Sequence, residues 1–164
     1  MELFPEYEMP AAPLADRLRP ESWERFAGQG HLIGEGLPLR DLVESGSKLS
    51  FILWGPPGTG KTTLARIAAR LTESEFHEIS AVNAGVADIR KVIEGARQIW
   101  KAKQKGTVLF IDEIHRFNKA QQDAVLPHIE NGTVRLIGST TENPSFEVNP
   151  ALRSRCQIFR LESL

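Results

Sequence analysis

The chain has 164 residues, of which 41% are hydrophobic and 25% charged, a composition typical of a single globular domain with a hydrophobic core. The formal net charge of −1 gives no overall basic field, so any contact with nucleic acid has to come from a local patch or from parts outside this sequence. The single cysteine, Cys156, excludes an internal disulfide and a cysteine zinc cluster, which fits a reducing cytoplasm. No apolar stretch is long enough to span a membrane, and the acidic N-terminus is unlike a secretory signal.

The first residues combine prolines, glutamates and scattered apolar side chains, which predicts a mobile arm over residues 1–13 ahead of a folded core over residues 14–164. Within the arm, the pair Leu3-Phe4 suits docking into a hydrophobic groove, for instance on a sliding clamp. The alternative, a disordered leader without a partner, is favoured by the composition.

From residue 38 onward, helices and strands are expected to alternate. Short apolar runs predict strands at residues 50–54, 76–80, 107–111, 134–138 and 158–161. Helical spacing predicts helices at residues 38–44, 63–70, 88–103 with Asp88 as its cap, and 119–130 despite Pro127. This alternation predicts an α/β fold in which helices cover both faces of a doubly wound parallel sheet. Ligands of such sheets bind at the carboxyl ends of the strands.

The first strand is followed by a match to the phosphate-binding loop pattern G-x-x-x-x-G-K-[ST], formed by Gly55, Pro56, Pro57, Gly58, Thr59, Gly60, Lys61 and Thr62. Glycines let backbone N–H groups turn toward a phosphate chain. Lys61 is expected to reach the terminal phosphates, Thr62 to hold Mg²⁺, and Thr63 to complete the nucleotide-binding set. A glycine-rich turn that matches by chance is the alternative, which the strand before and the helix after it disfavour.

The third strand ends in two acids, Asp112 and Glu113, as in a Walker B motif. Asp112 is expected to hold the Mg²⁺ shell and Glu113 to polarise the attacking water. Two solvated acids in a loop are the alternative. The acid pair also argues against a nucleotide kinase, which has to exclude water from its site.

Two further polar groups follow later strands. Thr140 and Thr141 end the fourth strand, where a hydroxyl could touch the γ-phosphate or the attacking water. Arg153 and Arg155 lie just before the last strand. Such a basic pair is either a solvated face or an arginine finger supplied to a neighbouring subunit, a role that suits the fixed charge and planar fork of arginine.

These four elements in this order resemble the AAA+ ATPases, and in particular the branch of clamp loaders and Holliday-junction motors. Two runs are similar to the replication-associated recombination protein A family, which includes the eukaryotic Werner-helicase-interacting ATPases: DEIHRFNKAQQD at residues 112–123 and GSTTENPSFE at residues 138–147. Shorter matches at residues 79–82 and 13–20 extend the resemblance over nearly the whole chain.

The resemblance implies a P-loop NTPase fold, a three-layer αβα sandwich with a five-stranded parallel sheet. It also implies Thr141 rather than Thr140 as the sensor of the γ-phosphate, and Arg155 as the finger, with Arg153 as the alternate. It assigns the walls of an adenine pocket to Arg19, Pro20 and Gln29, with Ile33 as a weaker candidate. His115 and Phe117 are expected to pack or signal rather than to bind metal, because no second histidine is spaced to help.

The function that the resemblance implies is that of an ATP-binding and ATP-hydrolysing core, with ATP and Mg²⁺ as cofactors. The complete protein would be a DNA-dependent, cytoplasmic, nucleoid-associated ATPase in replication-fork maintenance, recombination and DNA repair. Its expected partners are ATP and ADP, DNA junctions or ends, single-stranded-DNA-binding protein, replisome components and further copies of itself in a tetramer.

The family's lid and C-terminal oligomerisation helices are expected to lie outside residues 14–164, so hydrolysis by this segment alone is expected to be weak. Three alternatives remain: a nucleotide-dependent binding or switch module with little hydrolysis, a subunit of the clamp-loader or Holliday-junction-motor type, and a P-loop kinase. The last is disfavoured by the acid pair.

Overall fold

A five-stranded parallel sheet forms the centre of the molecule. The computed structural model describes residues 38–44 and 50–162, so the predictions for the N-terminal arm and for Arg19, Pro20, Gln29 and Ile33 lie outside the described residues. The strands are β1 (Ser50–Trp54), β2 (Glu75–Ser80), β3 (Thr107–Asp112), β4 (Arg135–Thr140) and β5 (Cys156–Arg160). They lie in the order β2-β3-β4-β1-β5, and every neighbouring pair is parallel. The predicted α/β fold with a five-stranded parallel sheet is confirmed.

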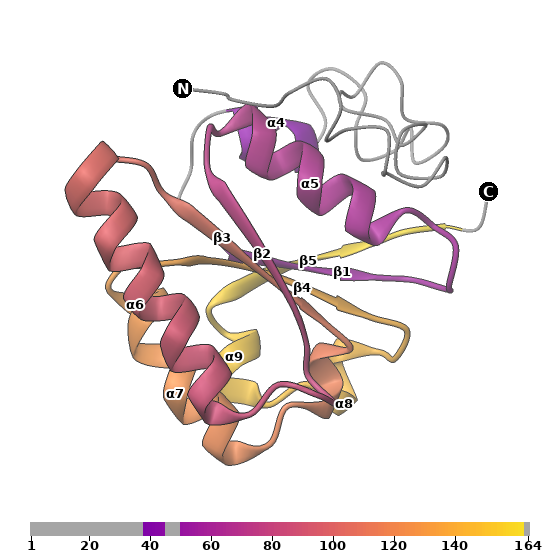
Figure 1. Cartoon of the computed structure of the whole chain (residues 1–164). Coiled ribbons are helices and arrows are strands. Elements are labelled where there is room, and N and C mark those ends of the chain that lie inside the picture. The colour runs from indigo at the N-terminus through magenta and orange to yellow at the C-terminus, as the bar shows by residue number, and fades with distance from the viewer. Residues whose placement is uncertain (1–37, 45–49, 163–164) are drawn as a thin grey trace, which may run out of the picture.

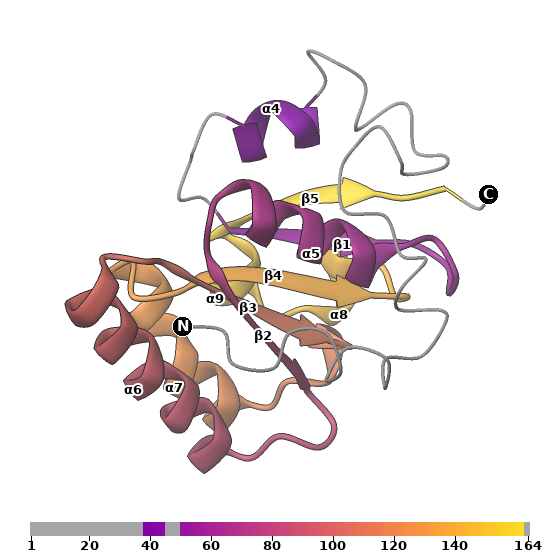
Figure 2. The same ribbon diagram turned by 45° about the horizontal axis from the view of Figure 1, so that its top comes forward.

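Helices cover both faces of the sheet, as Figures 1 and 2 show. One face carries α4 (Pro38–Glu44) and α5 (Lys61–Leu71), and the other carries α6 (Val86–Lys103) and α7 (Lys119–Glu130). Three shorter elements complete the second layer: the 3₁₀-helix η3 (Ile114–Arg116), α8 (Pro144–Glu147) and α9 (Pro150–Arg153). The three layers therefore enclose two separate hydrophobic cores.

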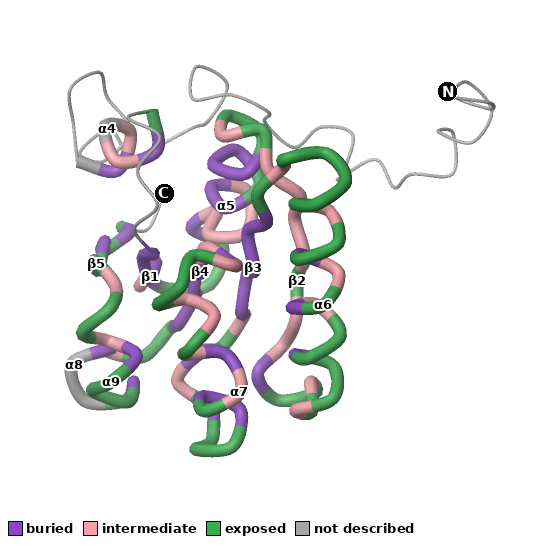
Figure 3. Tube along the Cα trace, turned by 90° about the vertical axis from the view of Figure 1, so that its left-hand side faces the viewer, coloured by how far each residue is buried: buried purple, intermediate pink, exposed green. Residues whose placement is uncertain are grey.

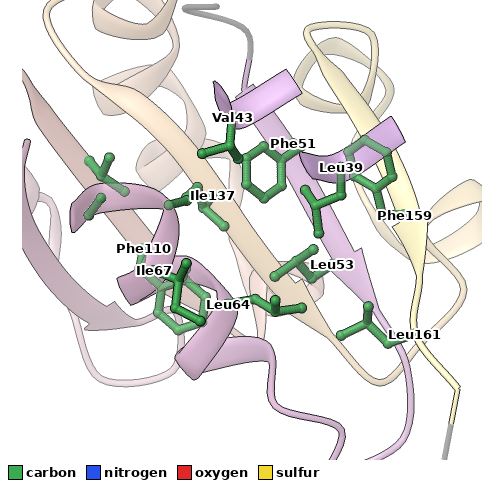
Figure 4. Packing of buried hydrophobic residues seen from close by; sticks show 14 residues of the cluster. Leu39, Val43, Phe51, Leu53, Leu64, Ile67, Phe110, Ile137, Phe159 and Leu161 are labelled. Carbon is green, nitrogen blue, oxygen red and sulfur yellow. The ribbon is translucent and has the colours of Figure 1, made fainter. Parts of the chain in front are cut away.

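The two cores follow from the alternation of side chains along the strands. Phe51 and Leu53 of β1 face α4 and α5, whereas Ile52 between them faces α6 and α7. Figure 4 shows the first core, in which side chains of α4 and α5 meet those of the sheet. The central strands are buried along most of their length (Figure 3), and Val108 to Ile111 of β3 have no exposed surface. A run that is apolar at every position fits a strand covered on both faces.

Several element boundaries differ from the expectation. Helix α6 begins at Val86, so Asp88 is not its cap but the third residue of its first turn, where its carboxylate accepts the Gly85 N–H at 2.8 Å. Strand β4 continues to Thr140, two residues beyond the predicted end. Strand β5 covers Cys156–Arg160 instead of residues 158–161.

Candidate nucleotide-binding site

Three loops meet at the carboxyl edge of the sheet. Because all five strands are parallel, the loop after β1, the acids after β3 and the threonines after β4 emerge on the same side. The Gly55 N–H donates to the Thr140 carbonyl at 3.1 Å and so ties the first of these loops to the third. The structure thus brings together the phosphate loop, Asp112 and Glu113, and the pair Thr140 and Thr141.

The phosphate loop depends on glycine at three positions. Gly58 has a φ of 80° and Gly60 a φ of 89°, in the left-handed region that other residues adopt at a cost. At Gly55 a Cβ atom would lie 2.8 Å from the Leu161 carbonyl oxygen, so only glycine lets the loop leave β1 beside the end of β5. The buried Thr59 hydroxyl donates to the Pro56 carbonyl at 2.9 Å and holds the turn from inside.

Lys61 is the first residue of α5, two residues earlier than the predicted start of that helix. Its side chain folds back over the loop, where Nζ donates to the carbonyl oxygens of Gly55 at 2.6 Å and Pro56 at 3.0 Å. Burial lowers the pKa of Lys61 below its usual value, and the nearby Asp112 carboxylate opposes this shift in part. The ammonium therefore lies between neutral carbonyls and one acid. Thr62 and Thr63 follow in the first turn and are half-buried.

Asp112 is the last residue of β3, and one of its carboxylate oxygens is held by two donors. Oδ1 accepts the Ser139 hydroxyl at 2.6 Å and the Glu113 backbone N–H at 3.1 Å. Glu113 itself is exposed and has a left-handed φ of 55°. An acidic residue in this conformation is uncommon, and such outliers concentrate at functional sites.

The two threonines after β4 have different surroundings. Thr140 is 1% exposed, and its hydroxyl is hydrogen-bonded to His115 Nδ1 at 2.8 Å and to the Glu142 N–H at 2.9 Å. Thr141 is exposed instead. It borders a cleft of about 530 Å³ whose other lining residues are Trp54, Gly55, Pro56, Pro57, Arg160, Leu161 and Glu162. Of this pair, Thr141 and not Thr140 lines the cleft beside the phosphate loop.

The structure does not bring Arg153 and Arg155 to this edge. Arg155 precedes β5 at the end where Ser50 begins β1, and one five-residue strand spans roughly 17 Å. Its guanidinium lies 3.3 Å from the Glu130 carboxylate at the end of α7. Arg153 donates to the Pro144 carbonyl at 3.4 Å. Arg155 therefore lies at the amino edge, opposite the phosphate loop of the same chain, whereas the Arg153 guanidinium contacts the start of α8.

Sequence reasoning missed two features of the site. Ser139 was not singled out, although its hydroxyl contacts Asp112. The stacking of Arg160 over the Trp54 ring, at 5.3 Å from the centroid, was also not foreseen. Both contacts join strands that are distant in the sequence, so only a correct strand register could have revealed them.

The residues at this edge fit a hard divalent cation that keeps most of its ligands as water and phosphate. Within residues 38–44 and 50–162, no cluster of three or more His, Cys, Asp or Glu side chains is placed to hold a metal ion. Mg²⁺ at phosphate sites needs only one or two protein oxygens. Asp112 Oδ2, which has no hydrogen-bond partner among the described residues, and the Thr62 hydroxyl fit that requirement.

Comparison with known proteins identifies the class to which this fold and site belong. The profile of the AAA family, the "ATPase family associated with various cellular activities", matches residues 51–163. The chain therefore belongs to the AAA family of ATPases. Among solved structures, the Holliday junction branch migration motor RuvB of Thermotoga maritima is similar with a TM-score of 0.69 and 35% identity, over 89% of this chain and 48% of that one.

Within this class, the chain is similar to replication-associated recombination protein A. It is 58% identical to that protein from Haemophilus influenzae and 57% identical to that from Escherichia coli K12, in each case over 93% of this chain and 34% of the relative. It is 51% identical to ATPase WRNIP1 of Dictyostelium discoideum, over 17% of that protein. The family resemblance found in the sequence is confirmed. The chain spans about a third of the length of the first two relatives.

None of the helices in the described part of the chain is both long and apolar enough to cross a membrane.

Proposed function

We propose that this chain is the catalytic core that binds ATP with Mg²⁺ and hydrolyses it to ADP and phosphate. The observation that carries the proposal is the convergence at one sheet edge of a glycine loop with its lysine and of an acid pair after a buried strand. The loop from Gly55 to Thr62 would bind phosphate oxygens through its backbone N–H groups, with the N-terminus of α5 adding its positive dipole end.

Lys61 would change partners when ATP binds. In the structure its ammonium bonds to two neutral carbonyls, whereas phosphate oxygens are charged acceptors that form roughly twofold stronger hydrogen bonds. Thr62 and Asp112 would hold Mg²⁺, which supplies positive charge to the phosphate oxygens. Thr63 lies in the first turn of α5, near enough to the loop to contribute to nucleotide binding.

Hydrolysis requires that a water molecule attack the γ-phosphorus in line with the bond to the β-phosphate oxygen, which leaves with ADP. Glu113 would orient and polarise that water, and Thr141 would hydrogen-bond the γ-phosphate or the water. Arg155 would complete the site of a neighbouring subunit, because it lies at the wrong edge to reach its own. Arg19, Pro20 and Gln29 would line the adenine pocket.

The complete protein would use this ATPase as a DNA-dependent, cytoplasmic factor in replication-fork maintenance, recombination and repair. The proposal is supported by the similarity to replication-associated recombination protein A and to the RuvB motor. Its partners would be DNA junctions or ends, single-stranded-DNA-binding protein, replisome components and other copies of the chain in a tetramer.

The substitution Glu113→Gln in the full-length protein tests the hydrolytic role. Loss of the base is expected to lower ATP turnover about 100-fold or more while ATP binding is retained, since the amide keeps the size of the side chain. Glu94→Gln is a matched control, because Glu94 is exposed on α6 and its partners within the described part of the chain are neighbouring α6 side chains. Undiminished turnover in Glu113→Gln would overturn the role of Glu113.

A second function, that of a nucleotide-dependent switch with little hydrolysis, is favoured by one observation. Arg155, the arginine proposed to complete the site, lies at the opposite edge of the sheet, so a single subunit would hold an incomplete catalytic set. Isothermal titration with ATP beside a phosphate-release assay separates the two functions. Tight binding without phosphate release, in the assembled protein, would support the switch.

A further inference from the structure

The last three residues of β4 contact the four residues that carry the catalytic acids. We name Gly138, Ser139 and Thr140 the β4 clamp, and residues 112–115 the acid segment. Ile111 of β3 pairs in register with Gly138 of β4, so the next residues, Asp112 and Ser139, are neighbours across the two strands. Because side chains alternate along a strand, Ser139 faces the α5 side of the sheet and its two neighbours face the α6 side.

On the α5 side, Ser139 fixes one oxygen of Asp112. Ser139 is 1% exposed, and its hydroxyl donates to Asp112 Oδ1 at 2.6 Å, a short bond to a carboxylate. The Glu113 N–H also donates to Oδ1. Both donors therefore act on the same oxygen, which sets the carboxylate plane and leaves Oδ2 without a hydrogen bond among the described residues.

On the α6 side, Gly138 and Thr140 hold the residues that follow Glu113. A Cβ atom on Gly138 would lie 2.7 Å from Ile114 Cδ1 and 3.1 Å from its Cγ2, so the missing side chain makes room for the buried Ile114. The buried Thr140 hydroxyl is bonded to His115 Nδ1 at 2.8 Å. The acid segment is thus held at Asp112, Ile114 and His115.

Glu113 lies between these three contacts in a strained conformation. Its φ of 55° is in the left-handed region, where a residue with a side chain persists only if its surroundings hold it there. A carboxylate on a backbone of this kind keeps its direction only as long as both flanking residues are fixed. The clamp supplies those contacts from a single strand.

We propose that Ser139 and Thr140 are positioning residues for ATP hydrolysis. Ser139 orients Asp112 so that its second oxygen is available to the Mg²⁺-bound nucleotide, and Thr140 acts through His115 to hold Glu113. This inference rests on the proposed ATPase function and deepens it. The two hydroxyls therefore affect different steps. Ser139 orients Asp112, which would bind Mg²⁺, and Thr140 positions Glu113, which would orient the attacking water.

Ser139→Ala in the full-length protein tests the first role by binding rather than by turnover. Mg²⁺ is titrated at a fixed concentration of a fluorescent N-methylanthraniloyl ATP. Loss of a group that orients a metal-binding side chain typically weakens metal affinity 10- to 100-fold, so the Mg²⁺ half-saturation is expected to rise about 10-fold. Binding of the analogue without Mg²⁺ is expected to match the wild type. An unchanged half-saturation would overturn the role of Ser139.

Ser50→Ala is the matched control for this variant. Ser50 is 2% exposed, and its hydroxyl accepts the Leu136 N–H at 2.9 Å at the amino edge of the same sheet. The Ser50→Ala variant, like Ser139→Ala, loses one buried hydrogen bond. Its unfolding temperature should therefore fall, while its Mg²⁺ half-saturation stays at the wild-type value. A shift in half-saturation equal to that of Ser139→Ala would assign the effect to general destabilisation and overturn the inference.

Thr140→Val tests the second role, since valine keeps the shape and removes the hydroxyl. Misplacement of a catalytic group by about 1 Å can cost about 100-fold, so kcat is expected to fall roughly 10- to 100-fold with little change in KM for ATP. Thr140→Ser should restore kcat because it returns the hydroxyl that is hydrogen-bonded to His115. Wild-type kcat in Thr140→Val, or no recovery in Thr140→Ser, would overturn it.

The proposed function and this inference fail in different ways. If the assembled wild-type protein releases no phosphate from ATP, the proposed function is wrong. If the wild type releases phosphate and both clamp variants behave like it, the site is an ATPase without a β4 clamp, and only the inference is wrong.

Discussion

At Lys61, the stability of the fold favours an uncharged side chain, whereas phosphate binding favours a charged one. Its ammonium is half-buried, and burial lowers its pKa, which means that the folded state holds the proton less well than the unfolded chain does. The folded state therefore gains stability as pH rises from the lowered pKa toward 10.5, and near neutral pH the buried charge is a cost. A charge kept at such a cost is expected to serve a ligand.

Lys61→Met separates these two effects. Removal of the buried charge is expected to raise the unfolding temperature at neutral pH, and loss of the charged hydrogen bonds to phosphate is expected to weaken ATP binding about 10- to 100-fold. Differential scanning fluorimetry and isothermal titration measure the two quantities on one sample.

Lys119→Met is the control for this pair of measurements. Lys119 is also the first residue of its helix, but its side chain is 88% exposed and, among the residues that the structure describes, pairs with Asp123 alone. Neither quantity should change in it. A Lys61→Met variant that loses stability and keeps ATP affinity would contradict both parts of the prediction.

At the scale of elements, the second half of the family signature at residues 112–123 attaches α7 to the rest of the fold. Asn118 caps α7 by accepting the Gln121 N–H at 2.8 Å. The Gln121 side chain accepts the Asn118 N–H at 2.8 Å and donates to the carbonyls of Ala81 at 2.9 Å and Ala84 at 2.6 Å. One buried amide thus uses both its donors and its acceptor to join the start of α7 to the loop between β2 and α6.

Gln121→Leu is expected to lower the free energy of unfolding by about 1–3 kcal/mol, because leucine fits the space and leaves polar backbone groups without partners. Chemical denaturation measures the change. Gln98→Leu, on the exposed surface of α6, should change stability by less than about 0.5 kcal/mol. Equal effects at the two sites would show that the amide does not hold α7.

The elements that sequence reasoning predicted are those with a long enough pattern. The apolar run at residues 107–111 and the spacing of Ile89, Ile93 and Ala96 identify β3 and α6, because burial on two faces or on one helical stripe fixes the residue types. Helices η3, α8 and α9 have three or four residues each, which is too few for a period to show. The start of α6 was misplaced because Gly85, at its N-cap, offers no capping side chain.

The same division holds within the site. The loop with Lys61 and the acids at Asp112 and Glu113 were predicted, because backbone geometry and phosphate chemistry demand those residue types in a short run. The contact between Ser139 and Asp112 was not, because the two residues are 27 positions apart and meet only through the register of β3 and β4. Conversely, Thr140 ends β4 but its hydroxyl is buried against His115. A threonine at a strand end therefore does not by itself indicate contact with a ligand.

At the scale of the whole molecule, the phosphate loop and Arg155 lie at opposite ends of the neighbouring parallel strands β1 and β5, one strand length apart. The ion pair between Arg155 and Glu130 does not prevent a second role for the arginine. Both side chains are about half exposed, and such surface pairs contribute about 0–1 kcal/mol. An arginine finger contributes a factor of roughly 10³–10⁵ in rate, or about 4–7 kcal/mol. A neighbouring subunit's nucleotide would therefore compete successfully with Glu130 for the guanidinium.

Subunit mixing tests whether Arg155 acts on a neighbour. Arg155→Ala in the full-length protein is expected to lower ATP turnover at least about 1,000-fold, and Glu113→Gln about 100-fold or more. In a mixed ring, an Arg155→Ala subunit keeps its own Glu113 and can receive Arg155 from a Glu113→Gln neighbour. With equal amounts and random exchange, about a quarter of the interfaces are complete, so turnover should recover to about a quarter of the wild-type value.

The outcome of the mixing experiment also separates the two arginines. Arg153→Ala, mixed with Glu113→Gln in the same way, should give no such rescue, because turnover by Arg153→Ala alone is expected to stay near wild type. A large loss in Arg153→Ala that mixing restores would move the finger to Arg153. Failure of Arg155→Ala and Glu113→Gln to complement, while both variants co-assemble, would show that each subunit works without its neighbour's amino edge.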